Sequence, residues 1–307
     1  MIQQFPGTSI ESRPQNAILA DILYTSNGRL ATLERDTGRI AIFQNGKEKN
    51  SFVFHAPSKK KPEATAFFEK KGTFSVMDVR GAVLTRWSEQ GQLVAQDSIV
   101  PPLNSNQVSF AANGDFYSSA EGVRDKNFIL HYDKNGRLLD TLATNTPTKI
   151  PSASTGSIAK QLARGLIPDA LQDSILLATQ GEKVFVLHRS KPLLQCYVEG
   201  KLAFEKELHF PELPKIHEAV QIRNRLLTVE NHYIALSYWN DFTLGEDGSL
   251  YVLLALQNKP VIYKLQQDGE IIGRFTGVTG KGHLLAVSKR EIAIADALSG
   301  LITLYAI

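Results

Sequence analysis

Residues 247–275 read DGSLYVLLALQNKPVIYKLQQDGEIIGRF, and this stretch holds the pattern from which the fold is predicted. It opens with the turn dipeptide Asp247-Gly248 and an apolar strand, continues with a second strand from Val261 to Leu265, and ends, after Gly269, with a third from Ile271 to Phe275. Asp-Gly between apolar runs is a strong hairpin signal, because both turn residues need a positive φ. With the strand that precedes the turn, the unit is four short antiparallel strands, the size of one propeller blade.

The same unit recurs along the chain. Its first turn is found at Asn27-Gly28, Lys71-Gly72, Asn113-Gly114, Gln180-Gly181, Asp247-Gly248 and Lys289-Arg290. Its second glycine is found at Gly46, Gly91, Gly136, Gly200 and Gly269. Successive first turns are 44, 42, 67, 67 and 42 residues apart, so two of the intervals carry extra sequence. The count predicts an all-β, six-bladed β-propeller with two insertions.

The two ends of the chain predict closure of the ring. The sixth unit has only three strands, at Leu284 to Val287, Glu291 to Ala295 and Leu301 to Tyr305. Residues 1–7 can supply the missing fourth strand, because their pattern, MIQQFPG, repeats that of residues 271–277, IIGRFTG, the fourth strand of the fifth unit. Pairing the first strand with the last removes exposed sheet edges. We therefore expect one domain, 1–307. Its six blades are expected at approximately 17–55, 62–100, 104–144, 170–211, 232–277 and 280–307 plus 1–7. The two insertions are expected at approximately 145–169 and 212–231.

The repeat of Asn/Asp-Gly, apolar strand, Ile-x-x-Phe/Tyr, glycine and apolar strand resembles the NHL-repeat propellers and the wider TolB-like superfamily. The Trp-Asp and Gly-His signatures of WD40 blades are absent. The resemblance implies a six-bladed propeller and leaves activity open, because such families include binding scaffolds, lactonase-type enzymes and lyases.

Composition excludes several classes of function. The net charge is +3 and the basic residues are scattered, which argues against nucleic acid as a partner; the one cluster, Lys59-Lys60-Lys61, lies in an expected loop. A single cysteine, Cys196, allows no disulfide and no cysteine-based metal site, and its apolar neighbours indicate a buried thiol. No apolar run is long enough to span a membrane. The first residues lack the features of a signal peptide, so a cytoplasmic location is expected.

Both insertions follow the fourth strand of one blade and precede the first strand of the next, so they are expected on one face. In the first insertion, the four-residue spacing of Ile158, Leu162 and Leu166 predicts a short helix that ends at Pro168. The second predicts a helix from Lys215 whose face is formed by Ile216, Ala219, Val220, Arg223, Leu226 and Leu227. The helices either pack their apolar faces on the blades and each other, or form a docking wall beside the channel. Their remaining residues are mostly basic, and those considered for binding are Lys160, Arg164, His217, Arg223 and Arg225.

A ring of polar side chains is expected at the rim of the central channel, six positions before each first turn. Its members are Asp21, Thr65, Gln107, Ser174, Asp241 and His283. Such a ring either holds water or binds a ligand. Asp21, Asp241 and His283 are the candidate ligands for a divalent cation, although the ring has few carboxylates. Trp239 and Asn240 come directly before Asp241, where Trp239 either stacks on a ligand or packs under the second insertion.

No sequence motif of a known catalytic class occurs: there is no Gly-x-Ser-x-Gly elbow, phosphate-binding loop, dinucleotide fingerprint or His-Glu-x-x-His. The leading hypothesis is therefore a non-catalytic propeller that presents its insertion-bearing face to a protein or peptide partner and needs no cofactor. The alternative is a lactonase- or lyase-type enzyme with a divalent metal at the channel mouth.

Overall fold

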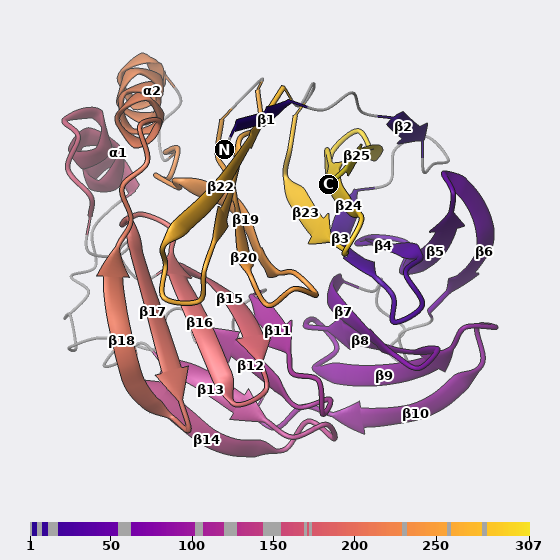
Figure 1. Cartoon of the computed structure of the whole chain (residues 1–307). Coiled ribbons are helices and arrows are strands. Elements are labelled where there is room, and N and C mark those ends of the chain that lie inside the picture. Colours follow the sequence, from indigo (N-terminus) through magenta and orange to yellow (C-terminus); the bar gives the residue numbers. More distant parts are fainter. Residues whose placement is uncertain are drawn as a thin grey trace.

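The computed structural model describes residues 18–54, 63–101, 107–119, 128–143, 155–168, 171, 174–228, 232–256, 259–277 and 281–307, together with the backbone of 2–4 and 8–11. These residues form six sheets arranged in a ring (Figure 1). The six-bladed propeller predicted from the repeat is confirmed.

Each blade is an antiparallel sheet whose strands follow chain order from the channel outward. Blade one comprises β3 (Leu19–Tyr24), β4 (Leu30–Glu34), β5 (Arg39–Gln44) and β6 (Lys47–Val53). Blade two comprises β7 (Ala64–Lys70), β8 (Thr73–Asp78), β9 (Val83–Ser88) and β10 (Leu93–Ser98). Blade three comprises β11 (Val108–Phe110), β12 (Phe116–Ser119), β13 (Phe128–Tyr132) and β14 (Leu138–Ala143).

The remaining blades follow the same plan, and two of them also take strands from the N-terminal region. Blade four comprises β15 (Ile175–Gln180), β16 (Lys183–His188), β17 (Leu193–Val198) and β18 (Lys201–Glu207). Blade five comprises β19 (Trp239–Leu244), β20 (Leu250–Leu254), β21 (Ile262–Leu265) and β22 (Ile271–Thr276), with β1 (Ile2–Gln4) at its edge. Blade six comprises β23 (Leu284–Val287), β24 (Glu291–Ala295) and β25 (Leu301–Ala306), with β2 (Thr8–Glu11) as its outer strand.

The glycines that define the repeat lie at the turns because the backbone there is left-handed. Gly248, in the first turn of blade five, has φ +77°, and Gly269, in its second, has φ +81°. Only glycine adopts such angles without strain from a Cβ atom. The glycines of the turn pattern therefore mark the positions where the backbone is left-handed.

The core consists of apolar clusters between neighbouring blades. In the described residues there are six such clusters; each joins two adjacent blades, and the one between blades four and five also includes residues of both insertions. The cluster that joins the first blade to the last includes Leu19, Ile22, Ala293 and Ile302, all buried. The innermost strands β23 and β3 are also in contact. The ring is therefore closed by packing as well as by strand pairing.

The closing strand differs from the prediction by its residues. Thr8–Glu11 pairs antiparallel with β25, so the N-terminal region does complete the C-terminal blade. The described part of the predicted closing strand, Ile2–Gln4, instead pairs parallel with β22 at the edge of blade five. The similarity of residues 1–7 to the β22 segment indicates an extended strand, but it does not identify the strand with which that segment pairs.

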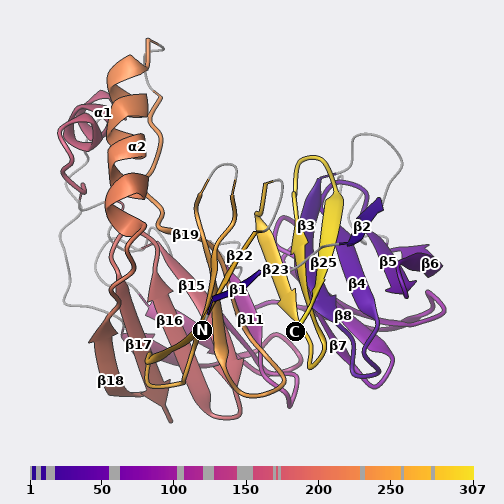
Figure 2. The ribbon, with the colours of Figure 1, turned by 45° about the horizontal axis from the view of Figure 1, so that its top comes forward.

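Two helices stand side by side on one face, over blades four and five (Figure 2). They are α1 (Thr155–Ala163) and α2 (Leu213–Leu226). The α2 face buried against the blades includes Ile216 and Val220 as predicted, but Leu226 is 73% exposed, so the predicted face is rotated. In α1, Ile158 and Leu162 are buried, while Leu166 lies beyond the helix end and is exposed. The prediction that each insertion contains one helix is confirmed.

The helices are fixed to the propeller and to each other by polar contacts. At the start of α2 the buried carboxylate of Glu212 accepts a hydrogen bond from the Tyr263 hydroxyl at 2.9 Å and pairs with Arg274 at 2.5 Å. Between the helices, His217 contacts the Gly165 carbonyl through Nε2 at 3.1 Å, and Arg225 donates to the Ala163 carbonyl at 2.9 Å. These contacts join the two insertions into one unit on blade five.

Candidate functional site

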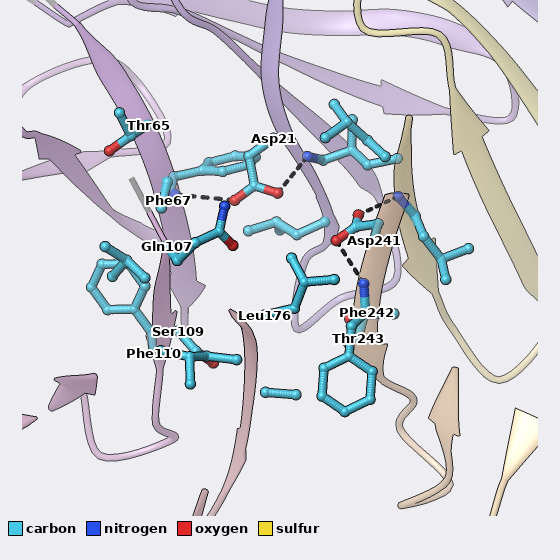
Figure 3. Close-up of a pocket in the computed structure, with 18 of the residues that line it drawn as sticks. Asp21, Thr65, Phe67, Gln107, Ser109, Phe110, Leu176, Asp241, Phe242 and Thr243 are labelled. Carbon is cyan, nitrogen blue, oxygen red and sulfur yellow. Dashed lines mark hydrogen bonds between the residues drawn. The ribbon is translucent and has the colours of Figure 1, made fainter. Parts of the chain in front are cut away.

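The innermost strands of the blades enclose a cavity of about 440 Å³ in the central channel. Four members of the predicted ring line it: Asp21 from β3, Thr65 from β7, Gln107 immediately before β11, and Asp241 from β19 (Figure 3). These four polar residues lie at or just before the starts of the innermost strands, and α2 leads into the start of β19. The polar end of the cavity lining and the helix therefore belong to the same end of these strands.

Asp21 and Asp241 are held in the same way by backbone amides. Oδ1 of Asp21 accepts the N–H of Ile22 at 2.8 Å, and Oδ1 of Asp241 accepts the N–H of Phe242 at the same distance. Each Oδ2 reaches the next innermost strand: Asp21 accepts from Phe67 at 3.3 Å, and Asp241 accepts from Leu285 at 2.6 Å. Both carboxylates point into the cavity (Figure 3). Their positions are therefore fixed before any ligand binds.

The environment of the channel shifts the acidity of both groups. The pKa of Asp21 is raised to about 8, first because burial disfavours the charged form and second because the negative charge of Asp241 repels it. Burial also raises the pKa of Asp241, to about 6, while the N–H groups of Phe242 and Leu285 and the positive charge of Arg189 act in the opposite direction. Near neutral pH the pair therefore carries about one proton, mainly on Asp21.

Two arginines that the sequence analysis did not select also line the cavity. Arg35 follows β4 and Arg189 follows β16, and they occupy corresponding places in blades one and four. Each donates its backbone N–H to the residue that precedes the innermost strand of its own blade, Ile18 or Ser174, at 2.8 Å. The Nε atom of Arg35 is buried and has no hydrogen-bond partner among the described residues. The sequence signal for these residues is an arginine directly after the second strand of the blade, at Arg35 and Arg189.

The other predicted ring members occupy different places. Ser174 lies just before β15 and does not line the cavity. His283 lines a neighbouring groove, where its Nδ1 lies 3.1 Å from a carboxylate oxygen of Asp296. Thr65 lines the cavity but is not equivalent to the two aspartates.

The reason for the difference at Thr65 lies in the strand register. The pairing of β3 with β4 is irregular between Leu19 and Asp21, and that of β19 with β20 between Trp239 and Asp241. In β7 the same irregularity lies between Ala64 and Ala66. Ala66 therefore takes the place of the aspartates. Counting from the turn fails here because the hairpin loop is shorter, with Lys70 paired to Thr73, whereas Tyr24 pairs with Leu30 in blade one.

The residues predicted for the insertion-bearing face do not form one surface. Trp239 is fully buried; its indole donates to the His188 carbonyl at 2.6 Å and packs edge-on against Phe210, so it lies under the second insertion. His217 and Arg225 join the two helices. Lys160 and Arg164 are exposed on the outer side of α1 and beyond its end. Only Arg223 and Asn240 line a common groove.

The candidate cation ligands Asp21, Asp241 and His283 do not converge. In the described part of the chain, no group of three or more His, Cys, Asp or Glu side chains could hold a metal ion. Cys196 is buried, and burial raises its pKa, as expected for a packed thiol. The Lys59-Lys60-Lys61 cluster lies outside the described residues. None of the described helices combines the length and the hydrophobicity that a membrane crossing requires.

Comparisons with known proteins support the fold. No family model and no curated protein sequence matches the chain. Among solved structures, virginiamycin B lyase from Staphylococcus aureus is similar, with a TM-score of 0.57, 10% identity and coverage of 99% of both chains. A streptogramin B lyase has a TM-score of 0.53 at 14% identity, covering 99% of this chain and 87% of that one.

A third similar structure is the calcium-binding protein regucalcin from Agrobacterium tumefaciens, with a TM-score of 0.56 at 10% identity, covering 99% of this chain and 95% of that one. At these identities the likeness shows the six-bladed propeller fold. The narrower resemblance to NHL-repeat and TolB-like propellers stays a prediction.

Proposed function

We propose that this propeller is an enzyme of the lactonase or lyase type, which performs acid–base chemistry on a small molecule in its channel. The observation that carries the proposal is the pair Asp21 and Asp241, which point into one cavity and have pKa values raised to about 8 and about 6, so that near neutral pH Asp21 is protonated and Asp241 ionised. Titratable groups whose environments separate their pKa values are typical of acid and base partners in active sites.

The two carboxyl groups take different roles. Near pH 7 Asp241 is ionised and accepts a proton, either from a water that attacks an ester or lactone carbonyl or from a carbon next to a carbonyl. Asp21 is protonated and donates a proton to the leaving oxygen. Arg35 and Arg189 line the same cavity and supply positive charge for the oxyanion that develops. Exchange with solvent then restores the starting protonation of the pair.

The fold comparisons support an enzyme over an interaction module. Two of the similar structures are lyases by name, and they share the whole propeller with this chain. The protein or peptide partner expected on the insertion-bearing face stays a prediction. This partner has less support, because the side chains of Trp239, His217 and Arg225 form hydrogen bonds with other parts of the chain.

The similarity to a calcium-binding protein suggests a divalent cation, but the described residues fit such an ion poorly. Calcium takes six to eight oxygen ligands. Here the four oxygens of Asp21 and Asp241 already accept backbone N–H groups, and His283 lies against Asp296. No step of the proposal is therefore assigned to a metal.

The proposal is tested with a panel of lactones and small esters, and of substrates for elimination, followed by proton release and mass spectrometry. Removing a general acid or base typically lowers the rate by about 10² to 10⁴. We expect Asp241→Asn and Asp21→Asn each to lose at least 100-fold in turnover while remaining folded at the assay temperature. The matched control is Asp268→Asn, an exposed aspartate that only accepts a turn N–H. Turnover that is unchanged in both channel variants would disprove the proposal.

A further inference from the structure

A second cavity of about 560 Å³ lies beside the channel, between α2 and the connections of blades five and six. One wall is α2 from Lys215 to Arg223, a length of about 12 Å at 1.5 Å per residue. The opposite wall is formed by the segment 281–283. We refer to this cavity as the α2 groove. Figure 2 shows α2 rising from one face of the propeller.

The α2 groove has an apolar floor. Ile216 and Val220 contribute from the helix, and Ile234 and Leu256 contribute from the segments before β19 and after β20. Ile216 and Val220 are largely covered by the blades, but their edges still line the groove. Such a surface favours an apolar body over a fully polar ligand.

The rim of the α2 groove is positively charged. Lys215 and Arg223 lie one at each end of the helix wall, and Lys281 lies across from them. Among the described residues these three side chains form no ion pair or side-chain hydrogen bond, and no acidic residue lines the groove. Three cations without anionic partners beside an apolar floor match a ligand that is apolar along its body and negatively charged at one end.

The α2 groove and the channel meet at Asn240, which lines both cavities. Its side-chain amide donates to the Gly282 carbonyl and so joins β19 to the opposite wall. We propose that the α2 groove binds the chain of a single-chain amphipathic carboxylate, with its acid group paired to Arg223 and Lys281 at one end of the groove. Resting on the proposed function, this makes the substrate class of the channel site an amphipathic anion whose reacting part reaches past Asn240 toward Asp241.

The test uses decanoate as the probe, with decanol as its uncharged counterpart, in isothermal titration calorimetry with the full chain. We expect decanoate to bind at one saturable site and decanol to bind at least tenfold more weakly. The double variant Arg223→Gln/Lys281→Gln is expected to lose at least tenfold in decanoate affinity. Its matched control, Lys160→Gln/Arg164→Gln, removes the same charge outside the groove and is expected to change affinity less than twofold.

Two further variants separate the groove from the channel. Ala219→Trp fills the groove from the exposed face of α2 and is expected to abolish decanoate binding, whereas Asp241→Asn is expected to leave it within twofold. Equal affinities for decanoate and decanol, or equal losses in the two double variants, would overturn the inference. Decanoate binding that depends on Asp241 and not on the groove would overturn it while leaving the proposed function intact. If groove binding holds but the channel variants keep full turnover, only the proposed function fails.

Discussion

The carboxylate of Asp241 crosses from blade five to blade six, where its Oδ2 accepts the backbone N–H of Leu285 at 2.6 Å. Asp21 makes the corresponding contact from blade one to Phe67 of blade two. The two side chains that face the cavity therefore also join neighbouring innermost strands. This double role explains how a polar channel keeps buried carboxylates in place, and it links the acidity of the site to the stability of the fold.

Stability should fall as pH rises through the neutral range. The folded pKa of Asp21, about 8, lies above its ordinary value of 3.8, so the folded state binds more protons than the unfolded state between these values. Unfolding free energy then decreases with pH, by up to about 1.4 kcal/mol per pH unit for one proton. Asp21→Asn should flatten this slope between pH 5 and pH 7. Urea unfolding at a series of pH values measures it, and parallel curves for wild type and variant would contradict the assignment.

Turnover should show a bell-shaped pH dependence. The base Asp241 must be ionised, which requires a pH above about 6, and the acid Asp21 must be protonated, which requires a pH below about 8. Initial rates on the best substrate of the panel, measured from pH 4 to pH 10, should therefore be highest near pH 7. A profile that keeps rising above pH 9 would exclude Asp21 as the acid.

The anchor of α2 should contribute measurably to stability. Glu212→Ala removes the partner of the Arg274 guanidinium and the Tyr263 hydroxyl, leaving both partly buried without their acceptor. We expect a loss of about 2 kcal/mol in unfolding free energy, less than for a fully buried pair because Arg274 is partly exposed. The control is Glu218→Ala, exposed on the same helix, which should change stability by less than about 0.5 kcal/mol. Equal effects of the two variants in urea unfolding would contradict the role of Glu212.

Two glycines with similar backbone angles should differ in their tolerance of alanine. Gly28 and Gly136 have φ +75° and +81°, so alanine is strained at either position by about 1 to 2 kcal/mol. At Gly28 a Cβ atom would meet nothing within 4 Å, whereas at Gly136 it would lie 2.9 Å from the Ser98 carbonyl oxygen of the neighbouring blade. Gly136→Ala should therefore lose a further 1 to 3 kcal/mol, as is typical of overpacking. Thermal unfolding of both variants measures the difference, and equal losses would show that the two blades can separate at this point without cost.

The architecture was accessible from the sequence because its determinants are local. The paired turns require left-handed residues at defined places, and Gly28, Gly72, Gly114 and Gly248 all have positive φ in the structure. The strand from Glu291 to Ala295 lies where the pattern put it. Closure by an N-terminal strand was predicted, but Thr8–Glu11 forms the closing strand, while Ile2–Gln4 pairs with β22, because the strand pattern does not identify the pairing partner.

The candidate site was accessible only in part. Asp21 and Asp241 were found by counting back from the turn, which works where the hairpins have equal loops and fails in blade two. Arg35 and Arg189 were missed because they lie at the end of the second strand, which the count did not reach. Whether Trp239 is buried or free to stack on a ligand could not be predicted, because its burial depends on packing against Phe210, which is distant in the sequence.

The most direct test of the central claim is a ¹³C NMR titration of the aspartate carboxyl carbons, with Asp21→Asn and Asp241→Asn used for assignment. We expect Asp21 to titrate near pH 8 and Asp241 near pH 6, and we expect Asp241→Asn to lower the midpoint of Asp21 because the repelling charge is gone. If both carbons titrate near the ordinary value of about 4, the channel does not hold an acid–base pair, and the proposed chemistry fails with it.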